Sequence, residues 1–423
     1  MMHFISCKLT VRAFLLVAFV TLNSVQANCC PFCGAVSATF AEEIELSDMA
    51  VYAKLVKLAP NAGANAQNVG VDDVPRATFI VDKVLKGEKF VKTDIEFQAI
   101  YFGEAKAGTK FLIYGASQPK PEWATPIEMS PALEKYLDVV LALPEDRGER
   151  ALKMQAYMLA EDSMVRQDAY NEFATTEYKD LQRVSKRFDL KQIRENLKNL
   201  DHEDSLLALN YTLLGICGGP EDLPMLEGRL LAKDDLERKR LDALLGCYLM
   251  LKGEAGLPLV EKQFIETDLK AQNFSRLYRV LLALRFHGDD GKSVSKEKIA
   301  PVLQKFLDYP KYADLVIPDL ARWQDWTVAD RVMELYRDKD NAAPFVRDPA
   351  VKYMRLCPLP VAEGYLAEMQ KIDGDAYKRA MLFPITPGGW KKDDSKTKET
   401  KKDDSPAKTG QSPEKTTAAK VKP

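Results

Sequence analysis

The stretch LLGICGGPEDLPMLEGRLL at residues 213–231 decides the fold, because LLGCYLMLKGEAGLPLVEKQFI at residues 244–265 is similar to it. Each copy contains a Leu-Leu-Gly helix, a turn with glycine, and a second helix with proline near its start. Such internal similarity is typical of repeated helix pairs, in which neighbouring pairs cover each other's apolar stripes. The two copies therefore predict an array of helix pairs over residues 146–390.

The predicted second helices share an opening that contains proline. IAPVLQKFL at residues 299–307 and LPVAEGYLAEM at residues 359–369 begin in this way. Proline favours the first turn of a helix, where its missing N–H leaves no hydrogen bond unmade. The prolines expected in first turns are Pro224, Pro258, Pro301 and Pro360.

Two further segments resemble the first helix of a HEAT unit. They are PFVRDPAVKYMRLCP at residues 344–358 and DSMVRQDAYNEFA at residues 162–174. The resemblance covers most of residues 146–390 and implies an α-α superhelical, HEAT-like solenoid. Such arrays generally offer protein-binding surfaces, so a protein partner is implied as well.

A small β domain is predicted in front of the helices. Residues 35–47 carry an apolar residue every fourth position and predict a helix. Alternating, β-branched and aromatic runs then predict strands. These strands are expected at residues 49–58, 77–85, 93–102 and 109–115, with a long polar loop at residues 59–75. So few strands favour a small curled sheet such as an OB-type barrel.

The order of these segments resembles netrin-like modules, the OB-fold domains that include tissue inhibitors of metalloproteinases. The resemblance covers residues 29–116 and is carried best by F-x-V-x-K-x-x-K-G at residues 79–87 and GTKFLIY at residues 108–114. It implies an OB-like fold for residues 28–118. Protease inhibition is not carried over, because Asn28 precedes the first cysteine and no cysteine lies between Cys33 and Cys217.

Three cysteines cluster at the start of this β domain, in Cys29-Cys30-Pro31-Phe32-Cys33. Cys30 and Cys33 have the spacing of a redox dithiol, similar to glutaredoxin-type sites, and a following helix would lower a thiol pKa. Those sites follow a strand inside a βαβ unit, which is missing here, so a structural disulfide within the cluster is the favoured interpretation. A metal site of three thiolates would need a fourth ligand that the sequence does not identify.

Cys217, Cys247 and Cys357 lie on the predicted apolar helix faces. The favoured interpretation is that they are buried thiols that pack as small apolar residues. A disulfide between Cys217 and Cys247 is the alternative, since both follow Leu-Leu-Gly in successive repeats.

The two ends of the chain predict an exported protein with a polar tail. Residues 1–27 have the basic start, the apolar run and the small residues before the cut that define a signal peptide, so an extracytoplasmic location is expected. No later segment is expected to span a membrane. Residues 119–145 are expected to form a proline-rich linker and a connecting helix that starts at Ser130-Pro131. Residues 391–423 are almost free of apolar side chains and are predicted to be disordered.

The charge balance excludes some partners. The chain has 60 basic and 62 acidic residues, which are interspersed, so no basic stripe marks a nucleic-acid site. The tail is basic and allows weak contact with anionic surfaces, although a solubilising role is the favoured interpretation.

No catalytic set is apparent in the sequence. After export only His202 and His287 remain as histidines, and each is expected near a helix end as a surface or capping residue. Trp323 and Trp326 are three apart on one helix, which favours core packing over a binding groove. Asp319 and Arg322 are candidates for an ion pair between repeats, and the alternative is an ordinary solvated pair. No catalytic, cofactor-binding or metal-binding residue is therefore assigned, and no cofactor is expected.

The sequence leaves two hypotheses for function. The first is a secreted, non-enzymatic interaction protein, in which the β domain is an adaptor and the helical array is a protein-binding surface. The second is an extracytoplasmic thiol-disulfide or metal-handling protein that uses Cys29, Cys30 and Cys33.

Overall fold

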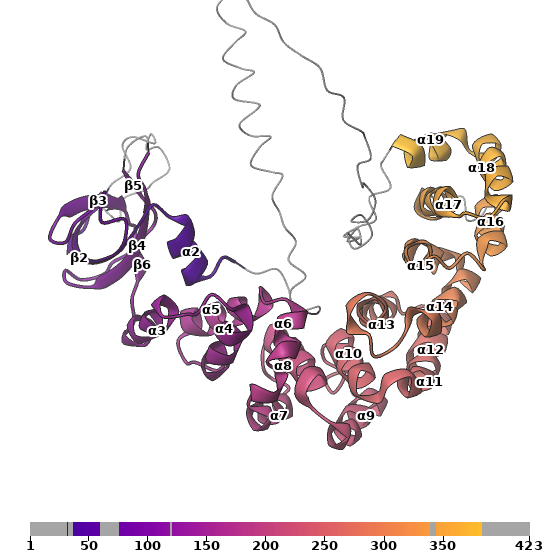
Figure 1. Cartoon of the computed structure of the whole chain (residues 1–423), viewed down its shortest axis with the longest axis horizontal. Helices are drawn as coiled ribbons and strands as arrows, with labels where there is room; N and C mark the ends of the chain where they lie inside the picture. Colours follow the sequence, from indigo (N-terminus) through magenta and orange to yellow (C-terminus); the bar gives the residue numbers. More distant parts are fainter. Residues whose placement is uncertain (1–31, 33–36, 60–75, 119–120, 339–343, 383–423) are drawn as a thin grey trace, which may run out of the picture. The chain divides into compact units, whose positions relative to one another are not determined.

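The structure is a computed structural model that describes residue 32 and residues 37–59, 76–118, 121–338 and 344–382. Within these ranges the protein belongs to the α+β class, as predicted, with a small antiparallel sheet followed by a helical region (Figure 1). The predicted signal peptide at residues 1–27, nearly all of the expected loop at residues 59–75 and the predicted disordered tail at residues 391–423 lie outside the described residues.

Six antiparallel strands form a nearly closed, barrel-like sheet. The main path runs β3-β2-β1-β4-β5, and β6 also pairs with β4. The predicted strands are confirmed, while β5 and β6 lie in the stretch that was expected to be a proline-rich connection. The strands are β1 (Met49–Lys57), β2 (Arg76–Lys86), β3 (Glu96–Ile100), β4 (Lys110–Ala116), β5 (Glu122–Trp123) and β6 (Ile127–Glu128).

Irregular pairing and one aromatic contact curl this sheet. The register between β1 and β2 shifts three times, and such bulges bend a strand and increase its twist. Phe97 of β3 and Trp123 of β5, from the two ends of the strand path, stack with ring centroids 4.1 Å apart. The contact brings the edge strands together, which leaves the sheet nearly closed.

Strands β1 and β4 are buried on both faces. Inside the barrel, alternate residues such as Val51, Phe79 and Phe111 form an apolar core. On the opposite face, Tyr52 and Leu112 belong to the same core cluster as the helices that follow. This is why the first half of β1 lacks the alternation of a strand with one solvated face.

The helical region begins with one helix before the sheet and continues after it. The helices are α2 (Phe40–Leu46), α3 (Pro131–Leu141), α4 (Arg147–Met154), α5 (Ser163–Ala174), α6 (Tyr178–Arg183), α7 (Leu190–Lys198), α8 (Asp204–Cys217), α9 (Leu223–Leu231), α10 (Leu241–Lys252), α11 (Leu257–Val260), α12 (Glu266–Ala271), α13 (Phe274–Phe286), α14 (Lys296–Gln304), α15 (Pro310–Arg322), α16 (Ala329–Arg337), α17 (Pro344–Leu356), α18 (Val361–Ile372) and α19 (Gly374–Leu382).

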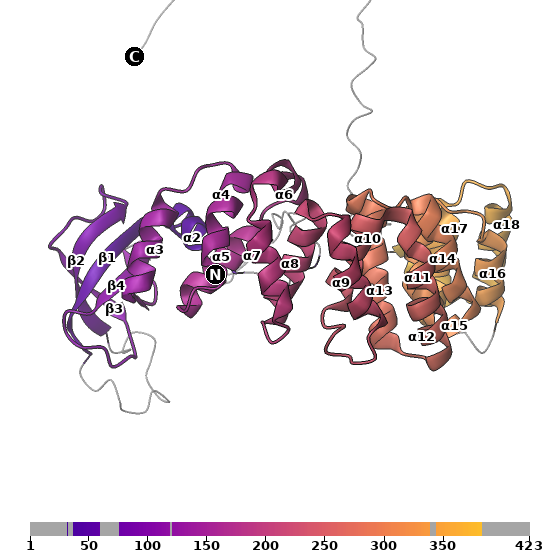
Figure 2. The same ribbon diagram turned by 90° about the horizontal axis from the view of Figure 1, so that it is seen from below.

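Helix α3 joins the barrel to the helices. Ser130 caps its N-terminus by accepting a hydrogen bond from the Leu133 backbone, and Pro131 fills the first turn, as predicted. Its buried residues Leu133 and Tyr136 share a core with the outer face of β1 and β4, over which α3 lies (Figure 2). The barrel and the helices are therefore joined by continuous apolar packing.

The helices α8, α10, α13, α15 and α17 lie side by side in one row, with one or two other helices between each pair in the chain. Contacts link α8 to α10, α10 to α13 and α15 to α17, while side chains link α13 to α15. Phe274 and Tyr312 meet near the two helix starts, whereas Arg285 and Asp319 meet near the two ends. These contacts show that α13 and α15 run in the same direction, with α14 between them in the chain.

The prolines fall only in part where they were expected. Pro224 and Pro258 lie in the first turns of α9 and α11, as predicted. Pro301 lies inside α14, so its first-turn assignment was wrong: the helix already begins at Lys296, after Ser295. Pro360 is the residue just before α18.

One described segment is long and apolar enough to span a membrane by length and composition. It is the run of helices from Leu241 to Ala271, in contrast to the sequence expectation of no such later segment. In this fold 56% of its most apolar window is buried inside the protein, as in the core helix of a globular protein.

Candidate functional site

The strongest buried polar cluster joins α2 to the helices that follow the sheet. Thr39, which caps α2, donates a hydrogen bond from its hydroxyl to Glu172 of α5 at 2.7 Å. The Glu172 side chain is fully buried, and Arg147 and Arg150 approach it at 3.4 and 3.7 Å. Arg147 also pairs with Glu42 of α2 at 2.9 Å. Two arginines therefore balance the charge of one buried carboxylate at the contact between α2 and the helices α4 and α5.

Asp168 lies one helical turn before Glu172 and extends the cluster. One carboxylate oxygen accepts the Phe40 backbone N–H at 2.7 Å, and the other accepts the Tyr136 hydroxyl at 2.7 Å. Burial raises the pKa of Asp168 to about 6, although both hydrogen bonds favour its charged form. The carboxylate thus satisfies an N–H at the start of α2, which would otherwise lack a partner within its own helix.

This cluster acts as a clamp rather than as an acid–base site. The carboxylates of Asp168 and Glu172 are occupied by hydrogen bonds and ion pairs within the protein. The sequence analysis did not identify Asp168 and Glu172. Their spacing of four was the available signal, because it places two acids on the same face of α5.

The predicted cysteine sites are only partly within the described residues. Cys29, Cys30 and Cys33 lie outside them, while Phe32 between these cysteines is described and buried. In the helices, Cys217, Cys247 and Cys357 are free thiols. Burial raises the pKa of the Cys217 thiol to about 11 and that of Cys247 well above its usual value, which disfavours the reactive thiolate. The Cys217–Cys247 disulfide stays a prediction.

The tryptophans and the Asp319 pair are structural. Trp323 is buried and donates its indole N–H to Asp289 at 2.9 Å, while Trp326 packs against Tyr353. Asp319 is buried and pairs with Arg322 of its own helix at 2.7 Å. The ion pair that links two helix pairs is formed instead by Arg285 of α13, which lies 2.8 Å from Asp319. Sequence spacing did not identify Arg285 as the partner.

His287 is buried, so its expected surface position was wrong. Its side chain lies at the end of α13, and its Nε2 is 3.1 Å from the Gly246 carbonyl of α10. Because a carbonyl only accepts, Nε2 carries the proton and Nδ1 does not. Burial lowers the pKa of His287 to about 4.

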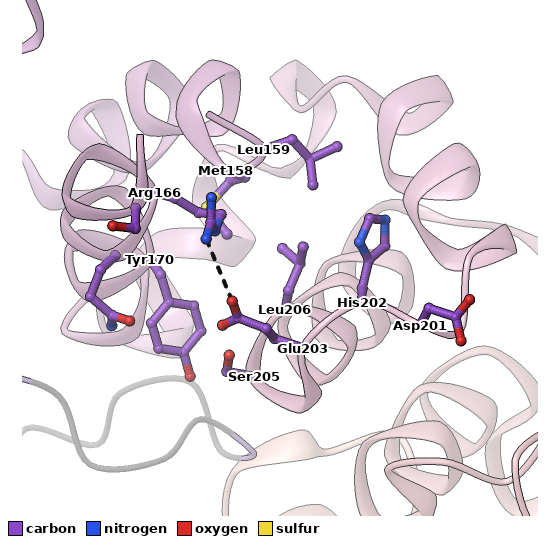
Figure 3. A pocket seen from close by; sticks show the side chains of 11 residues that line it. Met158, Leu159, Arg166, Tyr170, Asp201, His202, Glu203, Ser205 and Leu206 are labelled. Carbon is purple, nitrogen blue, oxygen red and sulfur yellow. Dashed lines mark ion pairs between the residues drawn. The ribbon is translucent and has the colours of Figure 1, made fainter. Parts of the chain in front are cut away.

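A surface pocket of about 400 Å³ lies between α5 and the start of α8 (Figure 3). Arg166 of α5 faces Glu203 across it, with 3.7 Å between the charged groups. His202 and Tyr170 lie on opposite sides of Glu203. The His202 side chain makes no hydrogen bond to Ser163 or Ser205 within the described residues, so no nucleophile and base are paired here.

The described residues hold no group of three or more His, Cys, Asp or Glu side chains that could bind a metal ion. Comparisons with protein families, with curated proteins and with solved structures find no match for this chain. The site is therefore interpreted from its own geometry.

His287 predicts an acid-sensitive contribution to stability. Its folded pKa of about 4 lies below the ordinary value of 6.5, so the unfolded chain binds the proton more tightly. Stability from this group is complete above about pH 6.5 and is lost as the pH falls toward 4, by about 3 kcal/mol. Urea unfolding of His287→Gln and of the unchanged protein from pH 4 to 7 should give a difference that shrinks with acid.

His202→Gln is the matched control, because His202 is partly exposed and its replacement removes no buried imidazole. Asp168 has the opposite effect on stability. Because its folded pKa is raised to about 6, it lowers the free energy of unfolding as the pH rises from about 4 to 6. This contribution is the same in the unchanged protein and in the His287 variant, so it cancels when the two are compared. A His287 difference that stayed constant with pH would contradict the assignment.

Proposed function

We propose that this protein is an extracytoplasmic, non-enzymatic protein-binding protein. In this proposal residues 28–118 form an OB-like, netrin-like module, and residues 146–390 form a HEAT-like solenoid that presents the binding surface. The signal-like segment at residues 1–27 supports the location.

The row formed by α8, α10, α13, α15 and α17 supports a repeat array. These helices begin at residues 204, 241, 274, 310 and 344, a spacing of roughly 35 residues, whereas HEAT units have about 40–47. The shorter spacing favours compact helix pairs. Repeats of this kind bury their stripes against neighbours and leave an extended surface free for partners.

An exposed aromatic cluster on this row carries the proposal. Phe274 and Tyr278 of α13 stack with centroids 6.1 Å apart and are 52% and 41% exposed. Phe274 also lies beside Tyr312 of α15, and Lys311 lies 4.9 Å from the centre of the Tyr312 ring. On α17, which packs against α15, Phe345 is 72% exposed. Tyr312 itself is buried, at 3% exposed, so we name the exposed pair Phe274 and Tyr278 the aromatic patch.

The composition of the aromatic patch is that of a protein-binding hot spot. Aromatic and arginine side chains dominate binding energy at interfaces, and Arg276 and Arg279 lie on α13 between and beside Phe274 and Tyr278. Arg276 and Arg279 are paired with Asp268 and Asp242, so the positive charge available beside the patch is that of Lys311, which favours a partner surface with both apolar and acidic side chains.

We predict that the aromatic patch binds the natural partner. A photo-crosslinking amino acid at position 274 should trap one partner during expression in the native host, while the same group at position 102 should not. With the purified partner, Phe274→Ser together with Tyr278→Ser should weaken binding more than tenfold, because truncated hot spots lose at least about 2 kcal/mol.

Phe102→Ser is the matched control, since Phe102 is also exposed but lies after β3. Equal trapping at both positions, or unchanged affinity in the double variant with an unchanged melting temperature, would contradict the proposal.

The second candidate is thiol-disulfide exchange by Cys30 and Cys33. The Cys-x-x-Cys spacing of these two residues supports it, and Phe32 between them in the sequence is buried against Phe286. Equilibration with a glutathione buffer tests it: a reversible couple near those of known oxidoreductases favours this candidate, whereas inert sulfurs disfavour it.

A further inference from the structure

Phe32 is buried in the helical region although it belongs to none of the helices. Its side chain is 4% exposed. Its ring lies edge-on to Phe286 of α13, with centroids 5.2 Å apart, and Phe286 packs in turn against Tyr178 of α6. Phe32 therefore fills an aromatic slot formed by side chains of α6 and α13, which follow the sheet in the chain (Figure 1 shows these helices).

Gly246 of α10 forms the floor of this slot. A β-carbon at this position would lie 2.4 and 2.5 Å from two atoms of the Phe32 ring, and its three nearest neighbours are all atoms of that ring. Glycine inside a helix costs about 1 kcal/mol relative to alanine. The missing side chain of Gly246 leaves the space that the Phe32 ring occupies.

Arg240 holds the backbone of the inserted residue. Its guanidinium donates to the Phe32 carbonyl at 2.6 Å. The same group makes two hydrogen bonds to Asp242, at 2.9 and 3.1 Å, and one to the Asp204 carbonyl at 2.9 Å. Arg240 also has a φ of 54°, in the left-handed region that non-glycine residues rarely adopt.

These contacts make the slot a pre-organised site. Asp204 and Asp242 belong to α8 and α10, so groups of the helical region fix the guanidinium independently of Phe32. Strained backbone held in place by its surroundings is concentrated at ligand-binding positions. The slot contacts a phenyl ring and a backbone carbonyl, which other peptide segments with phenylalanine can also offer.

We infer that this slot, defined by Arg240, Gly246 and Phe286, is a binding site for a phenylalanine of a peptide segment. Phe32 of the same chain is its resident, reversible ligand, so the protein covers the slot itself. The inference deepens the proposed function, on which it rests for the idea that the outside competitor is a protein segment.

Peptide binding to the full-length protein tests the inference. The probe is a fluorescent nonapeptide that copies residues 28–36 with serine at its three cysteine positions. A tethered ligand acts at an effective concentration near the millimolar range, so the unchanged protein should bind the probe weakly. Phe32→Ala empties the slot and should bind the probe at least tenfold more tightly. Phe32→Ala combined with Gly246→Leu refills the slot and should lose this gain.

Three outcomes would overturn the inference. The first is a Phe32→Ala protein that binds the probe no more tightly than the variant with the refilled slot. The second is equal binding of a control peptide with alanine at the phenylalanine position. The third is probe binding to the unchanged protein that weakens as the protein concentration rises, because the slot would then be occupied by Phe32 of a second copy.

A stability measurement gives a test that needs no peptide. Gly246→Ala should destabilise the unchanged protein, because the new methyl group collides with the Phe32 ring. In a Phe32→Ala background the same change should be neutral or stabilising, since alanine is the better helix former. An equal cost in both backgrounds would contradict the slot.

Failure of this inference is distinguishable from failure of the proposed function. Adding Phe274→Ser and Tyr278→Ser to the Phe32→Ala protein should leave probe binding unchanged, because the aromatic patch is a separate surface. Loss of partner binding in the patch variants with intact probe binding would leave both conclusions standing.

Discussion

Replacing Glu172 with alanine should lower the free energy of unfolding by about 3 kcal/mol or more. The side chain is fully buried, accepts the Thr39 hydroxyl and balances Arg147 and Arg150. Removing it leaves two positive charges facing an empty, poorly hydrated space. Urea unfolding at pH 7 measures the loss, and hydrogen exchange should show that α2 loses protection first.

Glu149→Ala is the matched control for this change. Glu149 lies on the neighbouring helix α4 and pairs with Arg187, but both side chains are largely solvated. Such exposed pairs contribute less than about 1 kcal/mol. A Glu172 variant that was no less stable than the Glu149 variant would contradict the clamp between α2 and α5.

Replacing Phe79 with alanine should destabilise the barrel by about 3–5 kcal/mol. Phe79 is fully buried, and its ring lies within 6.1 Å of the ring centres of Phe97, Tyr101 and Phe111. No smaller side chain fills that space, so a cavity remains in the only apolar cluster inside the described sheet. Chemical unfolding followed by tryptophan fluorescence measures the loss, because Trp123 stacks on Phe97.

Phe90→Ala provides the comparison within the same sheet domain. Phe90 is 42% exposed and lies between β2 and β3. Surface changes of this kind usually stay within about 0.5 kcal/mol. Similar losses for the two phenylalanines would mean that the interior of the barrel is not the tightly packed core described here.

Local patterns predicted the elements of this fold well. The β-branched and aromatic runs around Phe79 and Phe111 gave β2 and β4, and Ser130-Pro131 gave the start of α3. These signals depend on residues within one element, so a single sequence contains them. The two-residue strands β5 and β6 lack any such periodicity and were missed.

The contacts that build the candidate sites could not be predicted in this way. His287 is buried because the carbonyl of Gly246, on another helix, lies against it. Arg285 reaches Asp319 over 34 positions, and Arg240 reaches Phe32 over 208. No spacing rule within a helix or strand extends so far, and only the packed fold brings these residues together.

The outer face of the barrel has a consequence for the stack of helices. Tyr52 and Leu112 cover apolar side chains of α3 and its neighbours, so the first helices after the sheet have no apolar side left open toward it. In α19, the last described helix, Ala376 and Ala380 are buried and Leu382 is 79% exposed. The sheet therefore protects the helices nearest to it from water, and local opening of the helical region should be rarest beside the barrel.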